Sequence, residues 1–149
     1  MILCHTPVGS IGADWDGTSI TALHWARAGT LTDGPLLGQL KDELCRYFAG
    51  KLSDFEVPLN AGGNDFQRRF HRALCDIPYG ETRSYGDLAQ QLGVSAQAIG
   101  QACGANPIPI LIPCHRVLGA NGLGGYSGAG GIETKVALLK LEGAGSLLI

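Results

Sequence analysis

The sequence lacks the long apolar run that a membrane-spanning helix requires. No stretch of apolar residues approaches the roughly 20 residues that cross a bilayer, so no membrane partner is expected. The first ten residues, MILCHTPVGS, do not place an apolar stretch after a basic one, so we also expect no secretory signal.

The chain also lacks a disulfide framework. Its five cysteines are an odd number and form no CxxC spacing, which favours a reducing, cytoplasmic location. Four possible metal ligands near the start, Cys4, His5, His24 and Cys45, have a spacing that fits no established zinc pattern. We therefore predict no metal site.

Positive charge is scarce overall, since the net charge is −2. Residues 1–65 hold four Lys or Arg against eight Asp or Glu, whereas residues 66–149 hold seven against five. Because contact with phosphate needs local rather than global positive potential, the second half is the candidate for binding nucleic acid. A chance asymmetry is the alternative.

The first part of the chain predicts a small α/β domain over residues 1–60. Ser10–Trp15 and Ser19–Trp25 have strand character, and Asp16-Gly17 suits the turn of a hairpin between them. Pro35–Ala49 has helical apolar spacing, with a proline in its first turn and a glycine after its end. We expect one more strand over Lys51–Pro58.

A linker, Asn60–Asn64, precedes the second predicted domain, residues 61–149. We expect Asp65 to cap a helix over Phe66–Cys75. Two short helices follow, Tyr85–Leu92 and Ser95–Ala105, with Ser84 and Ser95 as N-caps and Gly93 between them, which is the helix-turn-helix pattern. That pattern alone also occurs in proteins that bind no DNA.

The rest of the chain leads to a cysteine beside a histidine. We expect a short buried strand or extended segment over Ile108–Ile112, a glycine-rich loop over Gly119–Gly131 and a last helix over Ile132–Leu141. Cys114 follows this segment after Pro113 and lies next to His115 in the sequence. An imidazole can take the proton of a thiol and make it nucleophilic, but in an extended strand these neighbours point to opposite faces. A buried structural cysteine is therefore the alternative.

Four blocks in fixed order change that balance: IPYGETRSYGDLA (77–89), GANPIPILIPCHRVLG (104–119), GGYSG (124–128) and LLKLEG (138–143). Together they make the chain resemble the O6-alkylguanine-DNA alkyltransferases from about residue 66 to residue 143. The resemblance implies an α/β N-terminal part and a mainly α C-terminal helix-turn-helix, winged-helix-like domain. It also implies DNA repair without a cofactor, by a monomer that binds duplex DNA containing O6-alkylguanine.

The resemblance implies an irreversible, single-turnover transfer of the alkyl group to Cys114. His115 matches the base that reaches the thiol through a water, and Glu142 matches the acid that orients this histidine. Without the resemblance, Glu142 reads as a solvated carboxylate near a helix end. Chemistry on a base requires that the nucleotide leave the stack. Residues that match the family's DNA and base contacts are Tyr85, Gln97, Asn106, Arg116, Val117, Tyr126 and Ser127.

Gln97 is a departure from the family pattern, which carries an arginine in the recognition helix to fill the gap left by the flipped base. Glutamine can still donate hydrogen bonds but is uncharged and shorter, so duplex affinity is the property in question. One competing hypothesis is a non-enzymatic module that binds alkylated DNA and recruits other repair factors. The presence of Cys114 speaks against it. A Cys-His hydrolase is a further alternative, without a signal for an oxyanion hole.

Overall fold

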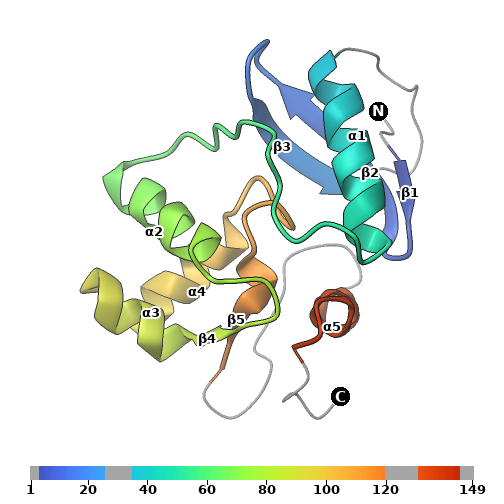
Figure 1. Cartoon of the computed structure of the whole chain (residues 1–149). Helices are drawn as coiled ribbons and strands as arrows, with labels where there is room; N and C mark the ends of the chain where they lie inside the picture. Colours follow the sequence, from blue (N-terminus) through green and yellow to red (C-terminus); the bar gives the residue numbers. More distant parts are fainter. Residues whose placement is uncertain (1–3, 26–34, 120–130, 145–149) are drawn as a thin grey trace.

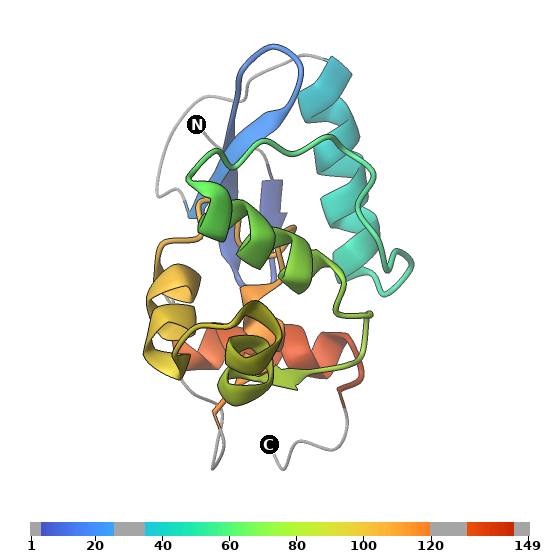
Figure 2. The ribbon, with the colours of Figure 1, turned by 90° about the vertical axis from the view of Figure 1, so that its left-hand side faces the viewer.

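The computed structural model describes residues 4–25, 35–119 and 131–144 (Figure 1). An N-terminal α/β part lies over a mainly helical C-terminal part, as two views at right angles show (Figures 1 and 2). No helix among these residues is both long enough and apolar enough to cross a membrane.

The N-terminal sheet contains the predicted hairpin. Strands β1 (Cys4–Thr6), β2 (Gly9–Trp15) and β3 (Ile20–Trp25) form an antiparallel sheet in that order. The turn between β2 and β3 forms because Asp16 Oδ1 accepts hydrogen bonds from the backbone N–H groups of Thr18 and Ser19 at 3.0 and 2.8 Å. Gly17 supplies the positive φ, 101°, that this turn requires.

Helix α1 (Pro35–Phe48) packs on this sheet through an apolar face (Figure 1). Leu37, Leu40 and Leu44 are buried at helical spacing, and each contributes about 1.5–3 kcal/mol of burial free energy. The helix was predicted from this spacing, and the expected stop at Gly50 is confirmed, since Gly50 has φ 74°.

The prediction of a strand over Lys51–Pro58 was wrong. The segment is irregular, and only Leu59 forms an isolated bridge, with Ile20. The cause is the buried Glu43 of α1, whose Oε1 accepts hydrogen bonds from the N–H groups of Glu56 and Val57 at 2.7 and 3.3 Å. A side chain thus takes the donors that a neighbouring strand would use.

Helix α2 (Asp65–Cys75) begins one residue before the predicted start, because Asn64 rather than Asp65 is its N-cap. Asn64 Oδ1 accepts from the Gln67 N–H at 2.8 Å, and Gln67 Oε1 accepts from the Asn64 N–H at 2.9 Å. This capping box satisfies two helix-end donors reciprocally. Asp65 occupies the first helical turn, where its charge is also favourable.

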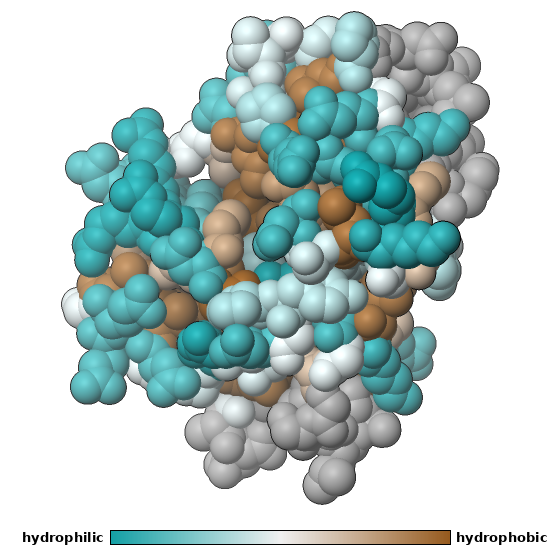
Figure 3. Space-filling view, viewed as in Figure 1, coloured by the Kyte–Doolittle hydropathy of each residue, from teal (hydrophilic) through white to brown (hydrophobic). Residues whose placement is uncertain are grey.

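The predicted helix-turn-helix arrangement is confirmed as α3 (Tyr85–Leu92) and α4 (Ala96–Gly104). Ser84 and Ser95 cap the two helices as expected, and Gly93 ends α3 in the left-handed region with φ 71°. Arg69 of α2 donates to the Leu92 carbonyl at 3.1 Å and so ties α2 to the end of α3. Hydrophilic side chains gather on the side where α2 and α3 lie (Figure 3).

The segment Ile108–Ile112 is buried as predicted, but it is not a strand. Asn106 Oδ1 accepts from the Ile108 N–H at 3.0 Å, its Nδ2 donates to the Ile112 carbonyl at 2.9 Å, and the Ile112 N–H reaches the Ile108 carbonyl at 2.9 Å. The chain therefore folds back on itself, with Ile110 at φ 73°. A β-branched residue at positive φ is strained, and the surrounding core holds it there.

The remaining elements close the C-terminal part. Strands β4 (Arg83–Ser84) and β5 (Val117–Leu118) pair in parallel, and α5 (Ile132–Leu141) forms the predicted last helix. Most of the predicted glycine-rich loop, residues 120–130, lies outside the described residues.

Candidate functional site

Cys114 and His115 lie in one turn of 3-10 helix, η1 (Cys114–Arg116), which follows directly after the folded apolar segment. The Arg116 N–H donates to the Pro113 carbonyl at 3.0 Å and closes this turn. Both side chains are buried, with 4% of Cys114 and none of His115 exposed. In an extended strand the two side chains would point to opposite faces, whereas in this turn both are buried in the protein.

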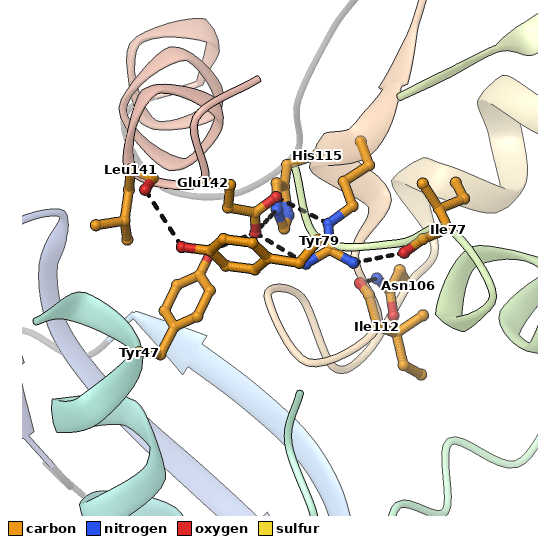
Figure 4. Close-up of polar contacts among 9 residues, drawn as sticks. Tyr47, Ile77, Tyr79, Asn106, Ile112, His115, Leu141 and Glu142 are labelled. Carbon is orange, nitrogen blue, oxygen red and sulfur yellow. Dashed lines mark hydrogen bonds and ion pairs between the residues drawn. The ribbon is translucent and has the colours of Figure 1, made fainter. Parts of the chain in front are cut away.

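Glu142, just after α5, is the centre of a buried hydrogen-bond network (Figure 4). Its Oε2 lies 2.7 Å from His115 Nε2 and accepts a bond of 2.5 Å from the Tyr47 hydroxyl. Arg116 donates through Nε to Oε1 at 2.8 Å and through Nη2 to Oε2 at 3.0 Å. The carboxylate is thus held by a histidine, a tyrosine and a bidentate arginine. It is not a solvated group at a helix end.

This network fixes the charge of Glu142 and the tautomer of His115. Burial acts to raise the pKa of Glu142, but hydrogen bonds from His115 and Arg116 outweigh it and bring that pKa to about 2. Burial lowers the pKa of His115 despite the opposing effect of Glu142. A neutral His115 facing an ionised carboxylate must carry its proton on Nε2. Nδ1 then has a free lone pair and, among the described residues, no hydrogen-bond partner.

The Cys114 thiol meets opposing influences. Burial raises its pKa, whereas a hydrogen bond from the Asn106 side chain and the charge of Lys135 lower it. Asn106 is 8% exposed, and its side chain also holds the apolar turn that precedes Cys114. It does not cap α4, since Ala105 is the C-cap residue.

Lys135 is a site residue that the sequence interpretation missed. It lies on α5, is fully buried, and its Nζ donates to the Val117 carbonyl at 2.6 Å. The same ammonium lies 5.8 Å from the centre of the Tyr85 ring. A lysine in a helix normally indicates a solvated face. The signal that could have revealed it is its spacing to the buried residues Leu138 and Leu139.

Tyr47 is the second missed residue. The apolar spacing of Pro35–Ala49 gave Tyr47 no role beyond packing, yet its hydroxyl bonds to a carboxylate 95 residues away. No local pattern predicts a contact of that separation. Because Tyr47 belongs to the N-terminal part, residues from both parts of the chain meet at this carboxylate (Figure 4).

Arg116 does not fit the predicted contact with DNA. Only 6% of it is exposed, and beside its two bonds to Glu142 it donates through Nη1 to the Ile77 carbonyl at 2.7 Å. Its guanidinium also lies 5.8 Å from the centre of the Tyr79 ring. The pairing of this cation with Glu142 keeps it inside the protein.

The other predicted contact residues are placed as follows. Val117 is buried, its N–H bonds to the Cys114 carbonyl, and its own carbonyl accepts from Lys135. Tyr85 is half-buried at the start of α3, and Gln97 is exposed in the first turn of α4. Tyr126 and Ser127 lie outside the described residues.

The residues that the structure describes contain no group of three or more His, Cys, Asp or Glu side chains that is placed to hold a metal ion. Of the four possible ligands weighed in the sequence, His24 lies 3.7 Å from Asp14 on the neighbouring strand, and Cys45 is an exposed free thiol.

Comparisons with known proteins agree along the whole chain. Residues 2–61 match the family described as 6-O-methylguanine DNA methyltransferase, ribonuclease-like domain. Residues 65–144 match the family described as 6-O-methylguanine DNA methyltransferase, DNA binding domain. The chain is 45% identical over 152 residues to the methylated-DNA–protein-cysteine methyltransferase of Mycobacterium tuberculosis, with 92% of the chain and 88% of that protein covered.

Solved structures give the same result. The crystal structure of Mycobacterium tuberculosis O6-methylguanine methyltransferase superposes with a TM-score of 0.83 at 44% identity, covering 95% of this chain and 90% of that one. The structure of Mycobacterium tuberculosis OGT in complex with DNA also gives 0.83, at 45% identity and with 95% and 91% coverage. An O6-methylguanine DNA methyltransferase from Methanococcus jannaschii gives 0.72 at 28% identity, with 96% and 93% coverage.

The fold therefore consists of a ribonuclease-like N-terminal domain followed by a DNA-binding C-terminal domain. Both family matches, the relatives and the solved structures lead to one conclusion: this chain belongs to the 6-O-methylguanine DNA methyltransferase family.

Proposed function

We propose that Cys114 accepts the alkyl group in the DNA repair reaction of this family. The observation that carries the proposal is the buried pair of His115 and Glu142, in which Nε2 is committed to the carboxylate and Nδ1, in the residue next to Cys114, has no hydrogen-bond partner among the described residues. A buried, unpaired imidazole nitrogen costs free energy unless a water or a reacting group uses it.

The reaction follows from these positions. His115 Nδ1 takes the thiol proton of Cys114 through a water, and the resulting thiolate attacks the alkyl carbon on guanine O6. The S–C bond forms as the O–C bond breaks, the bonding electrons stay on the guanine, and the proton held by His115 passes to the guanine anion. The product thioether has no good leaving group, so each chain reacts once.

Two neighbours support the thiolate. Asn106 donates a hydrogen bond to the thiol group, and the Lys135 ammonium supplies positive charge, both of which lower the pKa that burial raises. Lys135 also fixes the Val117 carbonyl at 2.6 Å. Arg116 neutralises Glu142, so the carboxylate orients His115 without drawing the proton permanently onto it.

For the DNA side, we assign duplex recognition to the helix-turn-helix, with α4 as the recognition helix. Gln97 is exposed in the first turn of α4 and would fill the gap that the flipped base leaves in the duplex. The short β4–β5 pair beside these helices supports a winged-helix-like assignment. We further propose a domain boundary near residue 61, action as a monomer, and a cytoplasmic location, where DNA is accessible.

The test is the intact mass of the protein after incubation with duplex DNA that contains O6-methylguanine. One added methyl group per chain, about 14 Da, is expected on Cys114. The variant Cys114→Ser should bind the same duplex without gaining mass. Modification of another cysteine or repeated turnover would overturn the proposal, and duplex binding by the unmodified chain without any mass gain would favour a recruiting module instead.

A further inference from the structure

Tyr47, a residue of the N-terminal domain, places its side-chain hydroxyl in the site. The residue is fully buried near the end of α1. Its ring packs against Phe48, Phe55 and Tyr79, at centroid distances of 5.1, 5.2 and 6.3 Å. The hydroxyl points out of this aromatic cluster and donates to Glu142 Oε2 at 2.5 Å (Figure 4). Apolar packing alone would have suited a phenylalanine here, so the hydroxyl has a separate role.

We propose that Tyr47 is a positioning residue through which the N-terminal domain sets the orientation and basicity of His115. The proposal rests on the proposed function, because it assumes that His115 is the base for Cys114. It gives the ribonuclease-like domain a part in the chemistry of a reaction whose nucleophile lies in the other domain.

Three donors share the same carboxylate oxygen. Glu142 Oε2 accepts from Tyr47 at 2.5 Å, from His115 at 2.7 Å and from Arg116 Nη2 at 3.0 Å. An oxygen has two lone pairs, so each donor reduces the charge that the others experience. The Tyr47 hydroxyl therefore limits how strongly Glu142 stabilises a protonated His115.

Removal of the Tyr47 hydroxyl should change the protonation of His115 in one direction only. With one donor fewer, more of the carboxylate charge faces the imidazole, which favours its protonated form. The other ionisable groups around this pair stay in place: Arg116 and Lys135 act against the protonated form of His115, and the Tyr79 phenol lies near the carboxylate. The imidazole of Tyr47→Phe should thus protonate at higher pH than that of the parent.

The chain provides a matched control. Tyr79 belongs to the same aromatic cluster, but its hydroxyl donates to the Leu141 carbonyl at 3.3 Å and makes no bond to the carboxylate. Tyr79→Phe removes one partly buried hydroxyl from the same region and keeps the ring beside Arg116. A purely structural effect of losing a hydroxyl should appear equally in both variants.

The experiment has two readouts. The first is the nitrogen chemical shifts of the His115 imidazole between pH 4 and 9 without DNA, which report its protonation and tautomer. The second is the single-turnover rate of methyl transfer over the same range. Tyr47→Phe should shift the imidazole titration and the acidic limb of the rate profile to higher pH and slow transfer at pH 7 by roughly tenfold. Tyr79→Phe should shift neither.

A third protein protects the test against misfolding. Fluorotyrosine at position 47 keeps the ring but has a more acidic hydroxyl, which donates more strongly, so both shifts should run to lower pH. Equal titrations in the parent, Tyr47→Phe and the fluorotyrosine protein, or equal shifts in Tyr47→Phe and Tyr79→Phe, would overturn the inference. Because the imidazole titration needs no substrate, a failure of Cys114 alkylation in the parent would be recognised separately as a failure of the proposed function.

Discussion

The replacement Glu142→Gln measures how much the ionised carboxylate contributes to the stability of the folded protein. Its pKa in the folded protein is about 2 against an ordinary value of 4.5. A difference of that size corresponds to about 3 kcal/mol of folding free energy at neutral pH. Because the folded-state pKa lies below the unfolded one, this stability is present above about pH 4.5 and is lost as the pH falls toward 2.

Glutamine keeps the shape of the side chain but not its charge, and it leaves the buried Arg116 without a counterion. Removing one partner of a buried ion pair typically costs about 3–5 kcal/mol, a large share of the roughly 5–15 kcal/mol that holds a protein of this kind together. We expect Glu142→Gln to be less stable than the parent by that amount at pH 7. The difference should shrink as the pH falls from 4.5 toward 2, since the unfolded parent then binds a proton that the folded parent does not.

Urea unfolding followed by circular dichroism at pH 7, 4 and 3 measures this difference. The matched control is Glu133→Gln, an exposed carboxylate near the start of the same helix. Its replacement should change the unfolding free energy by less than about 1 kcal/mol at every pH. A Glu142→Gln deficit that stays constant from pH 7 to pH 3 would refute the view that this carboxylate is ionised and stabilising in the folded protein.

Replacements of three further residues test the chemistry and the DNA contact. His115→Ala should slow methyl transfer by roughly 100-fold or more, the usual contribution of a general base, in single-turnover assays; an unchanged rate in a folded variant would remove His115 from the mechanism. Lys135→Met should raise the pKa of the Cys114 thiol further, so that transfer at pH 7 slows and recovers toward higher pH, and a parallel pH profile would contradict this. Gln97→Arg should bind duplex more tightly, with a log-log salt slope steeper by nearly one unit per added phosphate contact. Gln97→Ala should lose duplex activity yet keep its rate with free O6-alkylguanine base, and unchanged duplex binding in both Gln97 variants would mean that Gln97 does not touch DNA.

The sequence predicted those parts of the fold that local physics determines. The Asp16-Gly17 turn, the serine caps, the glycine stops and the apolar spacing of α1 are short-range signals, and they predicted the hairpin, α1 and the helix-turn-helix. The errors at Lys51–Pro58 and Ile108–Ile112 have a common cause. In each segment a distant or preceding polar side chain, Glu43 or Asn106, takes the backbone groups that a strand would have paired.

The site divides in the same way. The motifs predicted Cys114, His115 and Glu142 as site residues, and the structure joins the last two by a hydrogen bond. The 3-10 turn that carries Cys114 and His115 was not predicted. Tyr47 and Lys135 were missed because their roles depend on tertiary contacts, and each has an ordinary local reading, as an apolar helix position or a solvated lysine. Arg116 was predicted to contact DNA because a motif arginine in a DNA-binding protein suggests a contact with phosphate. In the structure this arginine is buried against Glu142.

The burial of Cys114 has a consequence for a protein that is consumed by its own reaction. A thiol that is 4% exposed and has a raised pKa is mostly protonated and hidden from small electrophiles in the surrounding solution. Stray alkylating agents and oxidants should therefore modify the exposed Cys45 and Cys75 first. Shielding costs some intrinsic reactivity, but it reserves the single use of each molecule for the alkyl group on guanine in DNA.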